Sequence, residues 1–257
     1  MLACLPWRPL QDSRGPFNLV VNVILERMSK ESPAQIQQRL LHFSVPVGLL
    51  QCNCSIIGDP ITREALVLDP GDEVHRIMDL LGRHRLKVKA IVSTHAHIDH
   101  VGGLKKLHDY TGAPVLMHRD DVPLYSAMDM QAAFLGVEPP ELAEVDQFLR
   151  EGDNLQWGNL EAQVMHTPGH TPGSSCLFLP ADRGKVTIAA PQLFAGDTLF
   201  AGSIGRTDLW GGSMEKMMNS LVHKILALPD ETVVHPGHGI ATTIGEERQS
   251  NPFLVGK

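Results

Sequence analysis

Four side chains that commonly bind metal ions lie within six consecutive residues. The segment 93–103 has the sequence STHAHIDHVGG, and its candidate ligands are His95, His97, Asp99 and His100. Histidines crowded this closely would repel one another when protonated, and they would add little to an apolar core. A bound metal ion accounts for this cluster better than core packing does, provided that the rest of the chain supplies further ligands.

Three more candidate ligands follow apolar stretches farther along the chain. His170 lies in the turn-rich sequence HTPGHTPGS, Asp197 follows LFAG, and His238 lies between the two glycines of PGHG. Each is expected where a strand gives way to a loop, so the three side chains can converge at one edge of the protein. The neighbouring glycines let the backbone approach a small site without steric cost.

The seven candidates offer five imidazoles and two carboxylates but no thiolate, a donor set that suits zinc, iron or manganese. Seven ligands exceed the four of one tetrahedral ion. They suit two ions if one carboxylate is shared, and Asp197 is the natural bridge. We therefore predict two divalent metal ions per chain, with zinc as the expected metal and iron or manganese as alternatives.

The remaining histidines do not share this pattern. His235 and Asp69 are equally consistent with simple packing and with hydrogen bonding to a metal ligand, because metal ligands usually need an outer partner. The histidines predicted to be surface or core residues are His42, His75, His84, His108, His118, His166 and His223.

The segments that must position the ligands form two rounds of strands, each followed by helices. Apolar runs bounded by turn residues predict strands at 40–46, 52–59, 64–71, 88–94, 114–118, 174–180, 185–190, 192–197 and 231–239, with a hairpin at 154–169. Helical spacing predicts helices at 72–85, 101–112, 119–136 and 214–229, the last capped by Ser213. The histidine cluster then lies just beyond the C-terminal end of a buried strand, where α/β sheets usually place chemistry.

Composition and charge narrow the function classes. The chain has 257 residues and a net charge of −7, which argues against a polyanionic partner such as nucleic acid. No run reaches the ~18 apolar residues of a membrane span, so no membrane association is expected. Four cysteines are too few for a disulfide framework, so we expect a reducing compartment and a cytoplasmic location.

Residues 1–38 are predicted to be an N-terminal extension that is possibly flexible, and residues 39–257 to be the functional domain. No clear small-residue cleavage site follows the apolar part of the extension, which makes it a poor signal peptide. Organellar targeting by this extension is left open. The sequence gives no indication of the oligomeric state.

The sequence HAHIDH, together with His170, Asp197 and His238, resembles the full ligand set of the metallo-β-lactamase fold superfamily over residues 40–253. The resemblance implies an α+β fold, a four-layer αββα sandwich, with the site at one edge of two sheets. It implies that one ion is held by His95, His97 and His170. It implies that the second ion is held by Asp99, His100 and His238, with Asp197 as the bridge.

Within that superfamily, GDTLFAGSIGRTD and HPGHGIATTIGEERQSNPF are similar to glyoxalase II-like hydrolases, and the match is closest to short relatives that lack the C-terminal helical domain. Such enzymes cleave S-acylglutathione thioesters, for example S-lactoylglutathione. Arg206 stands where the family has a lysine that binds the glutathione carboxylate, and Asp208 stands in place of a tyrosine. Arg206 either binds a substrate carboxylate or pairs with Asp208 to brace its loop.

These observations predict a dinuclear-metal hydrolase that cleaves a thioester. In this hypothesis a hydroxide shared by the ions attacks the acyl carbonyl, and Asp99 orients the hydroxide and accepts its proton. A thiol leaves without a dedicated acid because its pKa is about 8.5. The alternatives are a mononuclear-iron persulfide dioxygenase of the same fold, similar at GRTD and EERQSNP, a lactonase, and a non-catalytic binding module. The setting of His238 in PGHG favours the hydrolase.

Overall fold

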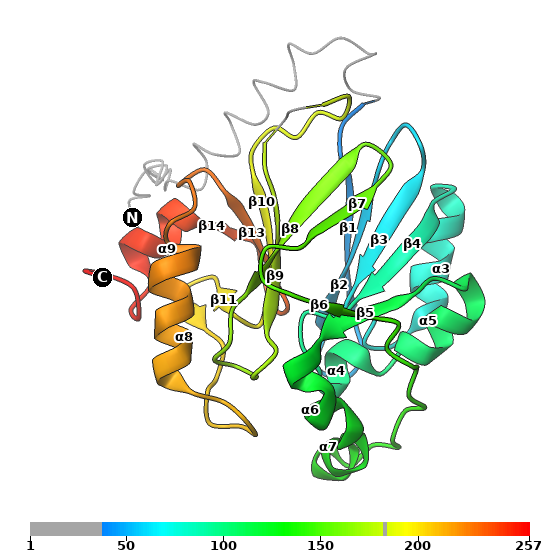
Figure 1. The fold of residues 1–257 in the computed structure, drawn as a ribbon, viewed down its shortest axis with the longest axis horizontal. Helices are drawn as coiled ribbons and strands as arrows, with labels where there is room; N and C mark the ends of the chain where they lie inside the picture. The colour runs from blue at the N-terminus through cyan, green and yellow to red at the C-terminus, as the bar shows by residue number, and fades with distance from the viewer. Residues whose placement is uncertain (1–37, 182–183) are drawn as a thin grey trace, which may run out of the picture. The chain divides into compact units, whose positions relative to one another are not determined.

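Two six-stranded β-sheets form the centre of the described part of the chain (Figure 1). The computed structural model describes residues 38–181 and 184–257. The first sheet has the order β1 (Leu41–Val47), β2 (Cys52–Gly58), β3 (Glu64–Leu68), β4 (Lys87–Val92), β5 (Val115–His118) and β6 (Gln147–Leu149). The second has the order β14 (Thr242–Thr243), β13 (Val233–Pro236), β10 (Gln192–Gly196), β9 (Ser175–Leu179), β8 (Leu160–His166) and β7 (Asn154–Trp157). A two-stranded ribbon consists of β11 (Leu199–Phe200) and β12 (Ser203–Ile204).

Helices cover the outer face of each sheet (Figure 1). Those of the first half are α3 (Val74–Arg83), α4 (Ile98–Val101), α5 (Leu104–Thr111), the 3₁₀ turn η1 (Arg119–Asp121), α6 (Val122–Ser126) and α7 (Met128–Leu135). Those of the second half are α8 (Met214–Ser220), which continues into the π-helical turn η2 (Leu221–Ile225), and α9 (Ile244–Ser250).

Alternation along the strands explains why the layers stack. In β3, Ala65 and Val67 pack on the helical side, whereas Leu66 and Leu68 face the second sheet. Successive strand side chains point to opposite faces, so a strand buried on both faces appears in the sequence as the continuous apolar run ALVL. In the second sheet, Phe194 faces the space between the sheets. The α+β fold and the four-layer αββα sandwich are thereby confirmed.

Most predicted elements are present, with several differences. The predicted helix 119–136 is divided into η1, α6 and α7, and no prediction covered β6, β11, β12, β14 or α9. The predicted helix 101–112 is preceded by a separate turn, α4, and a break at Gly102 and Gly103 divides them. The predicted cap of the helix at 214 is confirmed, because the Ser213 hydroxyl accepts a hydrogen bond from the Lys216 amide at 3.3 Å. That helix changes to a π-helical turn at Leu221.

The predicted strand 185–190 is wrong. Thr187 forms a single isolated bridge with Arg39, and the neighbouring residues join neither six-stranded sheet. β10 is already paired on both sides, by β9 and β13, so this segment finds no free edge beside it. Its apolar residue Val186 is buried in the core between the sheets without strand pairing. Burial of apolar side chains, rather than a ladder of hydrogen bonds, was the source of the strand-like pattern.

Residues 1–37 of the predicted N-terminal extension lie outside the described residues, so the predicted domain boundary stays a prediction. None of the helices in the two described ranges is long and apolar enough to cross a membrane. The predicted cytoplasmic location and the absence of a nucleic-acid partner also stay predictions.

Candidate metal centre

The candidate ligands follow strand ends that meet at one edge of the two sheets. His95 and His97 follow β4, and His97 is the residue before α4. Asp197 directly follows β10 and His238 lies two residues after β13. Because β10 and β13 are parallel, their C-terminal ends lie at the same edge of the second sheet.

Two glycines allow the loops to approach this edge. A Cβ atom on Gly71 would clash with the backbone carbonyl of Asp99, so only glycine lets the loop after β3 pack against α4. A Cβ atom on Gly237 would clash with the Asp197 carboxylate and lie 2.7 Å from the His100 ring. Because Gly237 has no side chain, Asp197 and His100 fit beside it, and the PGHG loop can bring His238 to the site.

All seven predicted ligands come together, in the two triads expected from the resemblance. The possible ligand atoms of each triad lie within 4.8 Å of one another. The first triad is His95, His97 and His170, and the second is Asp99, His100 and His238. A third group of the same kind, His95, His100 and Asp197, links the two.

Asp197 faces both triads with different oxygens. Its Oδ2 atom lies 3.5 Å from His170 Nε2, and its Oδ1 atom lies 3.5 Å from His100 Nε2. Asp99 Oδ2 lies 3.1 Å from His238 Nε2, at the other side of the second triad. One carboxylate with an oxygen toward each triad is the arrangement that a bridging ligand needs.

Backbone carbonyls fix which nitrogen of two ligands carries hydrogen. His170 Nδ1 donates to the Arg206 carbonyl at 2.7 Å, and His238 Nδ1 donates to the Leu50 carbonyl at 3.1 Å. Since a carbonyl only accepts, Nδ1 of each ring carries hydrogen, and Nε2 is the atom left to face the site as a possible ligand. The sequence motif around each histidine gives no sign of these partners.

A buried aspartate does the same for His95 and His100. Asp69 Oδ2 accepts from His100 Nδ1 at 3.0 Å and from the Thr94 hydroxyl at 2.7 Å. Because its hydrogen goes to Asp69, the Thr94 oxygen accepts from His95 Nδ1 at 3.1 Å. Asp69 thus supports ligands directly, which decides between the two roles that its sequence left open.

His235 takes the opposite role. Its ring stacks on Phe194 with centroids 4.9 Å apart, and its Nε2 atom pairs with Gln192 Oε1 at 2.7 Å. Burial lowers the pKa of His235 to about 3, so the ring is neutral. It is a packing residue in the second sheet, although only three positions separate it from His238.

The protonation states of the centre suit a cation. Burial lowers the pKa of His97 to about 3 and that of His95 well below its ordinary value. Burial tends to raise the pKa of Asp99, but the neighbouring His100 and His238 lower it below its ordinary value. Burial also opposes a charge on His100, yet Cys52, Asp197 and Asp99 raise its pKa well above the ordinary value. Neutral His95 and His97 and an ionised Asp99 therefore offer donor atoms to a cation. The raised pKa of His100 reflects the acidic groups gathered around it.

Unpaired atoms show that a divalent ion fits this donor set. His95 Nε2 and Asp197 Oδ1 are buried and lack a hydrogen-bond partner among the described residues. His170 Nε2 and His238 Nε2 lie against other ring nitrogens, those of His97 at 2.8 Å and His100 at 3.2 Å. Buried polar atoms without partners are costly, and a cation beside them removes that cost.

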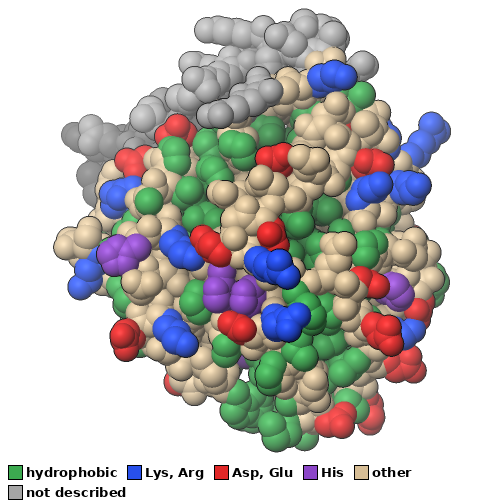
Figure 2. Space-filling view, viewed as in Figure 1, with side chains coloured by type: hydrophobic (Ala, Val, Ile, Leu, Met, Phe, Trp, Pro, Cys, Tyr) green, Lys and Arg blue, Asp and Glu red, His purple; other side chains and the backbone are tan. Residues whose placement is uncertain are grey.

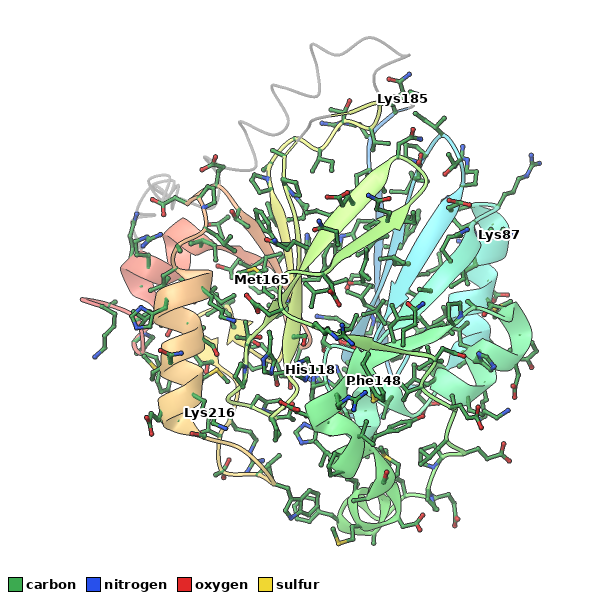
Figure 3. All side chains as sticks on the ribbon, in the orientation of Figure 1. Lys87, His118, Phe148, Met165, Lys185 and Lys216 are labelled. Atoms are coloured by element: carbon green, nitrogen blue, oxygen red, sulfur yellow. The ribbon has the colours of Figure 1, made fainter. Side chains whose placement is uncertain are left out.

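A fourth group of possible ligands, His118, Asp120 and His166, does not have metal-binding geometry. His118 ends β5 (Figure 3), and its ring stacks on His166 with centroids 3.9 Å apart and planes at 10°. Imidazole lone pairs lie in the ring plane, so two nearly parallel rings cannot both point at one ion. These two histidines are non-ligands, as their sequence context predicted.

Asp121 is a supporting residue that no sequence motif indicated. Its carboxylate accepts hydrogen bonds from the Ala96 amide at 2.9 Å, the Thr171 hydroxyl at 2.8 Å and the Gly173 amide at 2.6 Å. It therefore holds the loop of His95 and the loop of His170 together. These bonds join Asp121 to segments that are distant from it in the sequence, so no local pattern reveals them.

A cavity of about 340 Å³ opens over the ligands. Asp99 and Arg206 both line it. The Arg206 guanidinium forms a two-point ion pair with Asp208, with both distances at 2.8 Å, and both side chains are exposed. The ion pair is one of the two roles expected for Arg206. Substrate binding by Arg206, catalysis by Asp99 and ligation by the seven residues stay predictions.

The sequence matches the family described as the metallo-beta-lactamase superfamily over residues 47–238. A protein of Mycobacterium leprae is 42% identical over 225 residues, which cover 82% of this chain and 97% of that protein. The hydroxyacylglutathione hydrolase GloC of Haemophilus influenzae is 35% identical over 220 residues, covering 83% and 97%. The chain thus spans nearly the whole length of these relatives.

Three solved structures share the fold. The BLEG-1 B3 metallo-beta-lactamase has a TM-score of 0.75 at 36% identity, covering 84% of this chain and all of that one. The di-iron-bound form of TTHA1623 has a TM-score of 0.71 at 39% identity, covering 82% and 100%. ETHE1 from Myxococcus xanthus has a TM-score of 0.69 at 28% identity, covering 84% and 85%. The matched fold and the His/Asp clusters indicate a divalent metal centre.

Proposed function

This chain belongs to the metallo-beta-lactamase superfamily, and by that membership it is a metal-dependent hydrolase. We propose that its substrate is a thioester, namely an S-acylglutathione such as S-lactoylglutathione. The relative GloC, named a hydroxyacylglutathione hydrolase, supports this choice of substrate class. We further propose that the centre holds two ions and that they are zinc, with iron as the alternative.

The observation that carries the proposal is the pair of triads with Asp197 between them. Both triads are complete, and Asp197 directs one oxygen toward each at 3.5 Å. Bound divalent ions supply an acidified water, with a pKa near ~7, and a Lewis acid for the acyl carbonyl. The residues of the chain supply everything else that hydrolysis needs.

Asp99 is proposed to hold the attacking water and to take its proton. Its carboxylate lines the cavity and stays ionised because His100 and His238 outweigh burial and lower its pKa. A general base must lie beside the attacking water and must be ionised so that it can accept a proton. Asp99 Oδ2 also lies 3.1 Å from His238 Nε2, so the carboxylate lies beside another member of the second triad.

The cavity suits a leaving group that needs no proton. Among its described lining residues, the histidines are candidate ligands and Arg206 stays charged, so none is free to act as a general acid. A thiolate departs unassisted because its pKa is about 8.5, whereas an amide nitrogen must be protonated. This favours thioesters, and lactones after them, over β-lactams.

A second candidate function is the persulfide dioxygenase, because ETHE1 shares the fold at 28% identity. The resemblance at GRTD and EERQSNP implies a single iron for that activity. The complete second triad of Asp99, His100 and His238 favours the hydrolase, since a single-ion enzyme has no use for it.

The deciding experiment measures metal content and turnover on one sample purified without a metal-binding tag. Two ions per chain with S-lactoylglutathione hydrolysis, both lost in His97→Ala, would support the proposal. One iron per chain with oxygen uptake on glutathione persulfide, and no thioester hydrolysis, would replace it with the dioxygenase. Two ions without turnover of any thioester would leave a hydrolase of other esters, with lactones tested next.

A further inference from the structure

We infer that the acyl part of the substrate is an apolar chain of several carbons, bound against Phe134 and Trp210 beside the metal centre. The inference rests on the proposed thioesterase function and names its acyl group. It distinguishes this enzyme from one built for a short hydroxyacyl group such as lactoyl.

The cavity over the ligands has one polar wall and one apolar wall. The polar wall is the metal centre itself. The apolar wall is formed by Leu50, Ile98, Phe134, Leu135, Leu209 and Trp210. A substrate carbonyl placed at the metal centre therefore has hydrophobic side chains on its other side, within the same cavity of about 340 Å³.

Several of these side chains are exposed although they are large and apolar. Phe134 is 69% exposed, Leu50 45% and Trp210 43%. They come from three separate segments: the turn after β1, the end of α7 and the loop before α8. Figure 2 shows the hydrophobic surface over α6 and α7 at the foot of the view. Apolar surface gathered from unrelated segments around a cavity is typical of a ligand site.

Phe134 and Trp210 contact each other within the apolar wall of the cavity. Their rings meet edge to face with centroids 6.0 Å apart. Such a pair gains little from contact alone while both rings remain wet, because most of the stabilisation by aromatic rings comes from buried area. An alkyl chain that covers both rings would remove that area from water.

The cavity has room for a chain to continue. A second cavity of about 260 Å³ shares Leu50, Ile98, Asp99 and Leu135 with the first. It extends past Leu49, which is 74% exposed. The two cavities therefore adjoin each other beside the metal centre, and together they are called the groove.

Polar groups able to recognise a hydroxyacyl chain are already assigned. Gln131 donates to the carbonyls of Ala96 and Leu124, both at 3.0 Å, and accepts from the Ile98 amide at 3.0 Å. The Arg206 guanidinium is paired with Asp208, and its predicted substrate role is to bind a carboxylate and not the acyl chain. His97 Nε2 is unpaired, but it is fully buried and offers no surface to a ligand. The described lining of this cavity thus rewards apolar acyl groups.

The test varies the acyl chain on one carrier. The substrates are S-acetyl-, S-butanoyl-, S-hexanoyl- and S-lactoylglutathione, with the metal-loaded protein. We expect kcat/KM to rise about fourfold per methylene from acetyl to hexanoyl, equivalent to ~0.8 kcal/mol each, and the hexanoyl ester to exceed the lactoyl ester at least tenfold. Phe134→Ala and Trp210→Ala should reduce the hexanoyl rate more than the acetyl rate.

Tyr110→Ala is the matched control, because Tyr110 is a 70% exposed aromatic residue on α5 that lines neither cavity of the groove. It should leave the chain-length dependence unchanged. Calorimetry adds a readout that does not depend on turnover: S-hexylglutathione should bind at least tenfold more tightly than S-methylglutathione, with a negative heat-capacity change.

The outcomes separate the two proposals. Thioester turnover with a flat or falling dependence on chain length, and equal binding of the two thioethers, would overturn the apolar acyl site and keep the thioesterase. No turnover of any thioester by protein with two bound ions would overturn the proposed function itself. A chain-length dependence that survives in both aromatic variants would place the acyl chain elsewhere and contradict the inference.

Discussion

Asp69 Oδ2 lies 3.0 Å from His100 Nδ1, and the same oxygen accepts the Thr94 hydroxyl that orients His95. One buried carboxylate therefore fixes a ligand of each triad. His95 belongs to the first triad and His100 to the second, so the two proposed ion sites share an orienting group in addition to the predicted bridge. Loss of that group should affect both ions together.

We expect Asp69→Asn to weaken the binding of both ions about 10- to 100-fold, because an amide nitrogen in place of an oxygen turns an acceptor into a donor. Competition with a chelator of known affinity measures the effect. Loss of one ion with the other unaffected would contradict the shared role of Asp69.

We expect His238→Ala to lower the metal content from two ions to one per chain, because it removes a ligand of the second triad and leaves the first triad complete. Elemental analysis of dialysed protein gives the number. His235→Ala is the matched control: the ring packs on Phe194, so it should lower thermal stability while two ions remain bound. Equal metal loss in both variants would argue for general unfolding instead.

Asp59 should stabilise the fold far from the centre and in a pH-dependent way. Its carboxylate accepts from the Asn159 amide at 2.6 Å and the Ile61 amide at 2.7 Å, which ties the turn after β2 to the hairpin of β7 and β8. Burial acts to raise the pKa of Asp59, but these hydrogen bonds outweigh it and lower the pKa below its ordinary value. Such a group stabilises the fold above its unfolded pKa of about 3.9 and loses this contribution as the pH falls through its folded pKa.

Asp59→Ala should therefore lower the free energy of unfolding by about 1–3 kcal/mol at pH 7, because it leaves buried amides without an acceptor. The difference from the wild type should shrink as the pH falls below about 4. Urea unfolding of the metal-free proteins at pH 7 and below about pH 4 measures this difference in unfolding free energy. Asp79→Ala, which removes an exposed carboxylate, is the control. A difference that is the same at both pH values would show that the charge of Asp59 contributes nothing.

Arg206→Ala distinguishes the two roles of this side chain. An exposed ion pair contributes little to stability, so a substrate carboxylate can replace Asp208 at little cost. If Arg206 binds substrate as predicted, KM for S-lactoylglutathione should rise about 10-fold with kcat unchanged, and Asp208→Ala should not raise KM. An unchanged KM in Arg206→Ala, with lower thermal stability in both variants, would leave Arg206 as a brace for its loop.

The sequence alone determined the candidate ligands and most of the strands. His95, His97, Asp99 and His100 are recognisable because a loop and one helical turn bring them together within six residues. His170, Asp197 and His238 are recognisable because each follows an apolar strand and lies among glycines. These patterns are local, since strand alternation and strand ends are properties of short segments.

Only the tertiary structure decided what surrounds the ligands. Asp121 joins loops that are distant in sequence. Phe134 contacts Trp210 beside a cavity that exists only after α7 and the loop before α8 have packed. The segment 185–190 has a strand-like pattern, but the edges of β10 are already occupied. Hydrogen bonds and contacts between segments depend on the packing of both partners, so no single stretch of sequence contains them.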